Sequence, residues 1–189
     1  MKKYLIGALV GGIILFLWQG ASWMALGIHS SAMKYHPAQK EILSTLSSTT
    51  QEEGQYMMPS AATEKEQEDM QKQMDGKPWA SIIYHKSYNA DMTMRFIRAF
   101  LVDVFLVISL IYVLTRGATP TGRRIFSGSF AFGLAMWLWS MYMGHIWFDL
   151  PWSMITGDLI DSLVAWSLCG IWLAWWLNRP GNRAAPVSV

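Results

Sequence analysis

The chain has 189 residues, of which 52% are hydrophobic and eleven are tryptophan, and its formal net charge is +2. Spread evenly over a soluble domain, such a composition would be unusual, and it argues against an ordinary water-soluble protein. A single cysteine, Cys169, excludes a disulfide within the chain.

The apolar residues gather in four runs, each long enough to cross the roughly 30 Å hydrocarbon core of a bilayer as a helix. The runs cover residues 4–27, 94–115, 125–148 and 154–178. We therefore predict an all-α integral membrane protein, a four-transmembrane-helix bundle with a mainly helical extracytoplasmic insertion between its first two helices. The predicted parts are a first transmembrane helix in residues 1–27, the polar segment 28–93, transmembrane helices 2–4 in residues 94–178, and a cytoplasmic tail, 179–189.

Charge is distributed unevenly among the segments that connect these runs. Residues 1–3, 116–124 and 178–189 contain Lys and Arg but neither Asp nor Glu. Short segments rich in Lys and Arg mark the cytoplasmic side of a membrane. We therefore expect both termini inside, and residues 28–93 and 149–156 outside, in a protein of the plasma (inner) membrane. The basic segments fit this topology and anionic lipid rather than nucleic acid.

The first run follows a basic start, as a secretory signal does, but its sequence favours an uncleaved anchor. Its apolar stretch is long and contains Trp18 and Trp23, and no A-x-A cleavage site is present. Gly7 and Gly11 form a G-x-x-x-G pattern, which allows a neighbouring helix to approach closely. Glycine is also common in membrane helices that make no such contact, so the pattern alone does not predict one.

The segment 28–93 has a different character from the runs around it. A short helix is predicted over 37–46, followed by polar, turn-rich residues 47–60. Thr63 and Glu66 form a capping box that opens a charged helix ending at Met74, before Gly76. The segment has too few apolar residues for a core of its own, so we expect it to lie across the outer mouth of the bundle.

The four runs also suggest an internal repeat. When the first run is placed on the third, Gly12 aligns with Gly133, and when the second is placed on the fourth, Asp103 aligns with Asp161. Apolar helices align by chance easily, so a duplicated helical hairpin is a hypothesis. If it holds, Asp103 and Asp161 are counterparts.

Asp103 interrupts the second run near its middle. A carboxylate at that depth is costly unless it is protonated, paired or facing a wet cavity, so such residues are candidates for functional sites. One interpretation is a group that handles protons or ions. The other, which we favour, is a structural tie to Arg98, to His145 or to a Trp indole N–H. A lipid amine or a cation from a partner is a further alternative. The polar residues expected around the interior of the bundle are Asp103, Gln19, Arg98, Asp158 and Asp161.

All four histidines, His29, His36, His85 and His145, lie outside the runs or at their outer ends. If the first helix continues beyond the membrane, His29, Met33 and His36 share one face of it. Imidazole with thioether suits copper, imidazole with carboxylate suits zinc, and paired imidazoles can ligate haem. No H-E-x-x-H or C-x-x-C motif accompanies them, and interfacial histidines also pack against aromatic rings and headgroups. A metal or haem site is therefore an alternative hypothesis.

Catalytic motifs do not point to an enzyme. The sequence contains neither a G-x-S-x-G motif nor a Walker A loop. We expect a small accessory or scaffolding membrane protein that acts through helix–helix contacts and its extracytoplasmic cap, within a larger complex or a homo-oligomer. The alternatives are the metal or haem protein described above and a transporter of protons or a small solute that uses Asp103.

Overall fold

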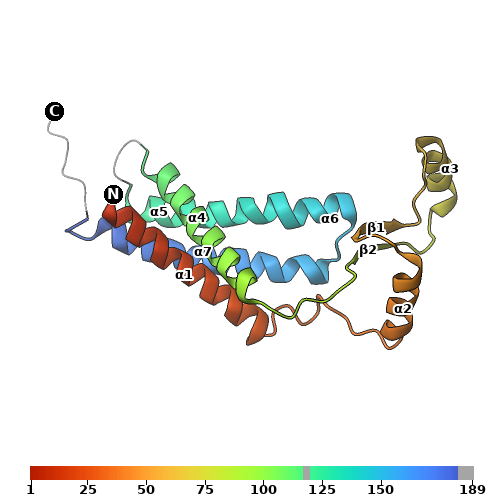
Figure 1. Ribbon diagram of the computed structural model, residues 1–189. Helices are drawn as coiled ribbons and strands as arrows, with labels where there is room; N and C mark the ends of the chain where they lie inside the picture. The colour runs from red at the N-terminus through yellow and green to blue at the C-terminus, as the bar shows by residue number, and fades with distance from the viewer. Residues whose placement is uncertain (117–119, 183–189) are drawn as a thin grey trace. The chain divides into compact units, whose positions relative to one another are not determined.

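The structure is a computed structural model that describes residues 1–116 and 120–182 (Figure 1). The chain divides into two compact units. The helical unit consists of Met1–Lys34 and the described residues from Met92 onward, and the insertion unit is Tyr35–Asp91. The sequence placed the start of the insertion at residue 28, whereas the contacts assign residues 28–34 to the helical unit.

Within the described residues, the helical unit contains four helices that are long and apolar enough to cross a membrane. The first is α1, Lys2–Met24; the second is α4, Thr93–Leu114; and the fourth is α7, Trp152–Asn178. The third is built from three consecutive segments: α5, Gly122–Trp137; the π-helical turn η1, Leu138–Tyr142; and α6, Met143–Phe148. The expectation of a mostly helical chain with four such helices is confirmed.

Sequential neighbours in the helical unit pack antiparallel, and small residues mark their close contacts (Figure 1). A Cβ added at Gly12 of α1 would lie 3.0 Å from the backbone of Val104 on α4. A Cβ added at Gly133 of α5 would lie 2.5 Å from the ring of Trp166 on α7. The two positions aligned in the repeat hypothesis thus both lie where a helical hairpin is tightest. The arrangement is not symmetric, however, because α1 packs along α7 far more extensively than α4 packs on α5.

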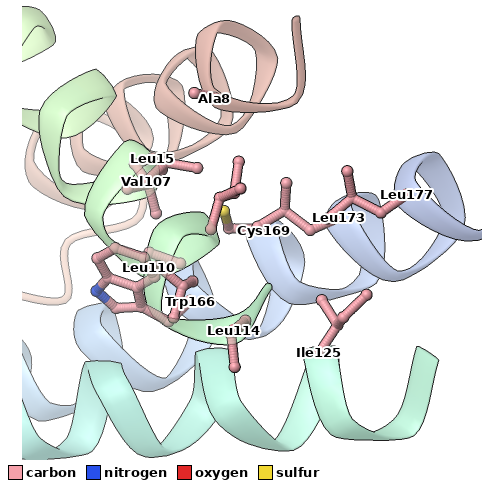
Figure 2. Close-up of a cluster of buried hydrophobic side chains, with 12 residues drawn as sticks. Ala8, Leu15, Val107, Leu110, Leu114, Ile125, Trp166, Cys169, Leu173 and Leu177 are labelled. Carbon is pink, nitrogen blue, oxygen red and sulfur yellow. The ribbon is translucent and has the colours of Figure 1, made fainter. Parts of the chain in front are cut away.

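The core of the helical unit is a cluster of buried aliphatic and aromatic side chains from all four long helices (Figure 2). Val107 and Leu110 of α4 lie against Leu15 of α1 and Cys169 of α7 in this cluster. Burying such side chains stabilises helix packing in water, whereas in lipid the gain comes mainly from close van der Waals contact. Cys169 is fully buried there and serves as a small apolar residue.

Hydrogen bonds join the start of α1 to the end of α7. The indole N–H of Trp176 donates to the backbone oxygen of Lys3 over 2.7 Å, and Trp172 donates to the backbone oxygen of Gly7 over 3.1 Å. The Lys3 ammonium donates to the backbone oxygen of Asn182. The N-terminus and the last described residues therefore lie at the same end of the helical unit.

The insertion unit contains two helices and an antiparallel pair of strands. Helix α2 spans Gln39–Thr49 and helix α3 spans Glu64–Met74, between strands β1, Gly54–Met58, and β2, Ala80–Tyr84. Gly54 pairs with Tyr84, and Met58 pairs with Ala80. The expectation of a turn-rich segment over 47–60 is wrong at residues 47–49, which continue α2 beyond the predicted end at 46, and at β1.

The capping box of the sequence is present in the structure. Thr63 is the N-cap of α3, and its side chain accepts a hydrogen bond from the backbone N–H of Glu66. Gly76 follows the end of the helix with a φ of 72°, a conformation that side chains with a Cβ rarely adopt. Helix α2 starts two residues after Pro37, and the backbone N–H of Ala38 donates to Nδ1 of His36 just before it.

Candidate functional site

Two consecutive residues of α1 donate hydrogen bonds to two carboxylates that belong to different helices, the buried Asp103 and the half-buried Asp161. The Trp18 indole N–H donates to Asp161 Oδ1 on α7 over 3.0 Å. The Gln19 amide donates to Asp103 Oδ1 on α4 over 2.9 Å. Adjacent residues of a helix point about 100° apart. Because α1 packs between α4 and α7, this angle directs one side chain to each neighbouring helix.

The Asp161 carboxylate has a partner for each of its oxygens. Oδ1 accepts from Trp18, and Oδ2 lies 2.8 Å from Nε2 of His29. Because an ionised carboxylate only accepts hydrogen bonds, Nε2 of His29 must carry the proton in this contact. Only 4% of the His29 side chain and 14% of the Asp161 side chain are exposed. The pair is therefore shielded from competing water.

The His29 ring is fixed on two further sides. The Trp23 indole stacks on it with a centroid distance of 3.9 Å and an interplanar angle of 7°. On another side lies Gly157 of α7, where an added Cβ would stand 2.8 Å from His29 Nδ1. Nδ1 is buried and has no hydrogen-bond partner among the described residues. Asp158 is close enough to His29 to interact with it electrostatically.

A turn after α1 brings His29 back to the bundle. Helix α1 ends at Met24, and Gly27 follows with a φ of 64°, which a residue with a side chain rarely adopts. The expectation that the first helix continues, so that His29, Met33 and His36 share one helical face, is therefore wrong. His29 lies on the turn and is buried, whereas Met33 and His36 are exposed.

The Asp103 carboxylate is satisfied on one side only. Oδ1 accepts from Gln19, whereas Oδ2 is buried without a hydrogen-bond partner in the described structure. The residue is 4% exposed. Asp103 also lines a cleft of about 490 Å³ along one face of α4, together with Gln19, Arg95, Arg98, Ala99, Val102 and Leu106. This carboxylate thus combines burial with a place beside a cleft that two arginine residues also line.

The structural ties proposed for Asp103 from the sequence take a different form in the structure. The donor to Asp103 is Gln19, while the Trp indole donor goes to Asp161. Arg98 lines the cleft beside Asp103, and His145 Nδ1 lies 2.6 Å from the backbone oxygen of Leu150. The sequence-predicted polar residues therefore form two separate groups rather than one shared interior.

The histidines make separate contacts within their own units. His29 pairs with Asp161 and His145 with a backbone oxygen in the helical unit, while in the insertion unit His85 lies 3.7 Å from Glu53. Across the described residues, no group of three or more His, Cys, Asp and Glu side chains is positioned to hold a metal ion. The proposed copper, zinc or haem ligands thus receive no support from the geometry.

Sequence reasoning missed the contribution of the aromatic residues at the end of α1. In the sequence, Trp18 and Trp23 indicate an uncleaved anchor, whereas in the structure Trp18 donates to Asp161 and Trp23 stacks on His29. Their spacing of five residues gives no pattern that predicts this, because the contact depends on the turn at Gly27. A buried carboxylate in the last helix, which needs a donor from another helix, was the available signal.

Comparisons with protein-family models, with curated proteins and with solved structures each find no match for this chain.

Proposed function

We propose that this chain is a four-span protein of the plasma (inner) membrane, with both termini in the cytoplasm and the insertion unit outside. The proposal rests on the four apolar helices and on the basic residues of the short segments 1–3, 116–124 and 178–189. The bonds that hold Lys3 beside Trp176 and Asn182 support it, because they put the two ends of the helical unit together.

We further propose an accessory or scaffolding role, in which the helical unit is a stable anchor and the insertion unit binds a partner protein in a larger membrane complex. The interhelical bonds of Trp18, Gln19 and His29 support the first part, since each joins α1, or the turn after it, to another helix. Polar contacts of this kind hold membrane helices in one arrangement.

The observation that carries the partner role is the uncovered apolar side of α2. Helix α2 has eleven residues, and none of them is buried. Ile42 is 43% and Leu43 is 58% exposed, and with Leu46 they occupy one side of the helix. A helix this short is marginal in water unless its apolar side packs against something. Its composition favours protein over the bilayer surface, because Lys40 is its only basic residue and surface-bound helices are rich in Lys and Arg.

The experiment compares two double variants of α2 in the full chain. Ile42→Ser with Leu43→Ser removes the apolar side, and Ser44→Ala with Ser48→Ala changes the opposite side as a matched control. Each protein is extracted from its own membranes in a mild detergent, and its size and co-purifying proteins are determined by native electrophoresis and mass spectrometry. We expect the wild type and the control to share a larger complex that the Ile42/Leu43 variant loses.

A photo-crosslinker at position 43 identifies what covers α2 in the membrane. Crosslinks from position 43 to another chain support the proposal. The Ile42/Leu43 variant is tested with the probe at position 46, and there the crosslinks to another chain should disappear. Crosslinks only to lipid or to the helical unit of the same chain would overturn it, as would a complex that the apolar double variant leaves intact.

A further inference from the structure

The cleft beside Asp103 is the part of the helical unit whose polar groups are least explained by helix packing. A carboxylate oxygen that is buried without a donor loses the hydration it had in water and gains nothing in return. Oδ2 of Asp103 is in this state, although the Gln19 amide serves Oδ1. A group that supplies hydrogen-bond donors, and a positive charge, would satisfy it.

Arg95 and Arg98 also line this cleft. Arg98 precedes Asp103 by five residues on α4, which is about 7.5 Å along the helix axis. The cleft therefore has a carboxylate at one depth and two cations closer to the start of α4. Guanidinium groups favour carboxylate and phosphate as partners, since they offer donors in a planar fork.

We infer that the cleft beside Asp103 binds a small molecule that carries both an ammonium group and an acidic group, the ammonium on Asp103 and the acid on Arg95 and Arg98. The ammonium adds donors to a carboxylate whose one donor among the described residues is the Gln19 amide. A ligand with an ammonium group and an acidic group therefore matches both signs of charge along the cleft. A phosphorylated amine and a dicarboxylic amino acid both have this charge pattern.

The remaining lining and the size of the cleft agree with such a ligand. Ala99, Val102 and Leu106 supply an apolar wall, and a volume of about 490 Å³ lies within the range of small-molecule sites. A pocket with mostly apolar walls and a few convergent charged groups fixes the orientation of what it binds.

The order of charges along α4 favours a free molecule over a lipid headgroup. On the proposed topology, on which this step rests, the start of α4 faces outward and Asp103 lies deeper in the membrane. The ligand therefore enters with its ammonium first and leaves its acid near the surface. An ethanolamine phospholipid has the same two groups, but its phosphate is the end attached to the buried acyl chains. It would have to turn its headgroup inward to reach Asp103.

The test measures binding to the full chain in nanodiscs of phosphatidylcholine, by isothermal titration calorimetry. The probes are phosphoethanolamine and glutamate. Glutarate, which lacks the amine, and ethanolamine, which lacks the acid, are the ligand controls. The variants are Asp103→Asn, which retains an acceptor for Gln19, and Arg98→Gln, with Arg123→Gln, an exposed change on α5, as the matched control.

We expect at least one of the two probes to bind the wild type and the Arg123→Gln variant. Glutarate and ethanolamine should bind at least tenfold more weakly than the probes. Asp103→Asn and Arg98→Gln should each weaken probe binding at least tenfold. Circular dichroism and gel filtration establish that each variant is folded, so a lost fold is not read as a lost site.

Three results would overturn the inference. The first is that neither probe binds the folded wild type at millimolar concentration. The second is that binding is unchanged by Asp103→Asn or by Arg98→Gln. The third is that nanodiscs containing phosphatidylethanolamine show bound lipid at the cleft while both soluble probes fail, because this would contradict the ammonium-first orientation. None of these results depends on whether α2 binds a partner protein.

Discussion

Asp103 and Asp161 invite comparison because adjacent residues of α1 donate to them and yet the two carboxylates have different sets of partners. Asp161 has a donor for each oxygen, Trp18 and His29, whereas Asp103 has Gln19 for one oxygen and, among the residues that the structure describes, no partner for the other. The two acids occupy aligned positions in the proposed repeat. Asp161 is surrounded by aromatic and imidazole groups, whereas Asp103 lines a cleft.

The difference teaches how to separate a structural from a functional carboxylate inside a helical bundle. A carboxylate with a fixed donor on each oxygen holds helices together and has less capacity left for a ligand. A carboxylate with a bare oxygen still has that capacity, provided that a molecule can reach it. Burial alone, which Asp103 and Asp161 share to a large degree, does not make the distinction.

The largest effect is expected from Asp161→Leu, which leaves the Trp18 indole N–H and the His29 ring N–H without acceptors. Breaking a buried, hydrogen-bonded pair by removing one partner costs several kcal/mol, and we expect a loss of about 3 kcal/mol in the free energy of unfolding. Titration of the full chain with SDS in mixed micelles, followed by circular dichroism, measures it. The control is Asp161→Asn, which keeps an acceptor oxygen and should lose less than half as much.

Gly157→Ala tests the same site without changing any of its polar groups. The added Cβ would lie 2.8 Å from His29 Nδ1, and the ring cannot retreat freely because Trp23 stacks on it. Overpacking of this kind costs about 2 kcal/mol. The same unfolding titration measures the loss. Gly20→Ala is the matched control, since its Cβ meets only the flexible end of Met24 at 3.5 Å, and it should leave stability equal or slightly higher.

Asp103→Leu sharpens the comparison because the same type of change should have little effect on folding. It removes one hydrogen bond from the exposed Gln19, and it also removes a carboxylate oxygen that has no partner. We expect a change in the free energy of unfolding below about 1 kcal/mol in either direction. A loss of unfolding free energy as large as that of Asp161→Leu would show that the two carboxylates contribute equally to stability, which would contradict the contrast between them.

The smallest effect concerns Glu53, a carboxylate of the insertion unit that is open to solvent. Its Oε1 accepts from the backbone N–H of Lys86 over 2.9 Å, and this bond lowers the pKa of Glu53, with His85 contributing in the same direction. A pKa that is lower in the folded state adds stability above the unfolded pKa, and this contribution is lost as the pH falls through the folded pKa.

We therefore expect the amide proton signal of Lys86 to shift as the pH is lowered through the acidic range, with a midpoint below the ordinary pKa of a glutamate. NMR of the full chain in micelles measures the shift. Glu53→Gln should abolish it while the signals of β1 and β2 keep their positions. A midpoint at or above the ordinary value would contradict the assigned hydrogen bond.

The sequence was most informative where one physical requirement dominated. Four apolar runs had to become helices, because a backbone in lipid must satisfy its own hydrogen bonds, and these helices are present. The capping box at Thr63 also appeared as expected, since it depends only on neighbours within one helical turn.

What could not be predicted depends on contacts between distant segments. The hairpin of β1 and β2 joins two five-residue strands on either side of α3, and the Gly-Gln-Tyr-Met-Met sequence of β1 lacks the alternation that marks a strand. The Asp161–His29 pair depends on the left-handed turn at Gly27, which returns the chain to α7. The sequence marks Asp103 as a candidate site, but it does not distinguish its donor, Gln19, from the other polar residues of the apolar runs.

The adjacency of Trp18 and Gln19 has a mechanical consequence. A rotation of α1 about its long axis, or a slide by one residue, moves both donors together. Such a movement of the helix therefore disturbs the hydrogen bonds to both carboxylates. Helix α1 therefore takes part in both carboxylate contacts through adjacent residues. A rotation of α1 large enough to separate Gln19 from Asp103 would also displace Trp18 from Asp161, the carboxylate that His29 contacts.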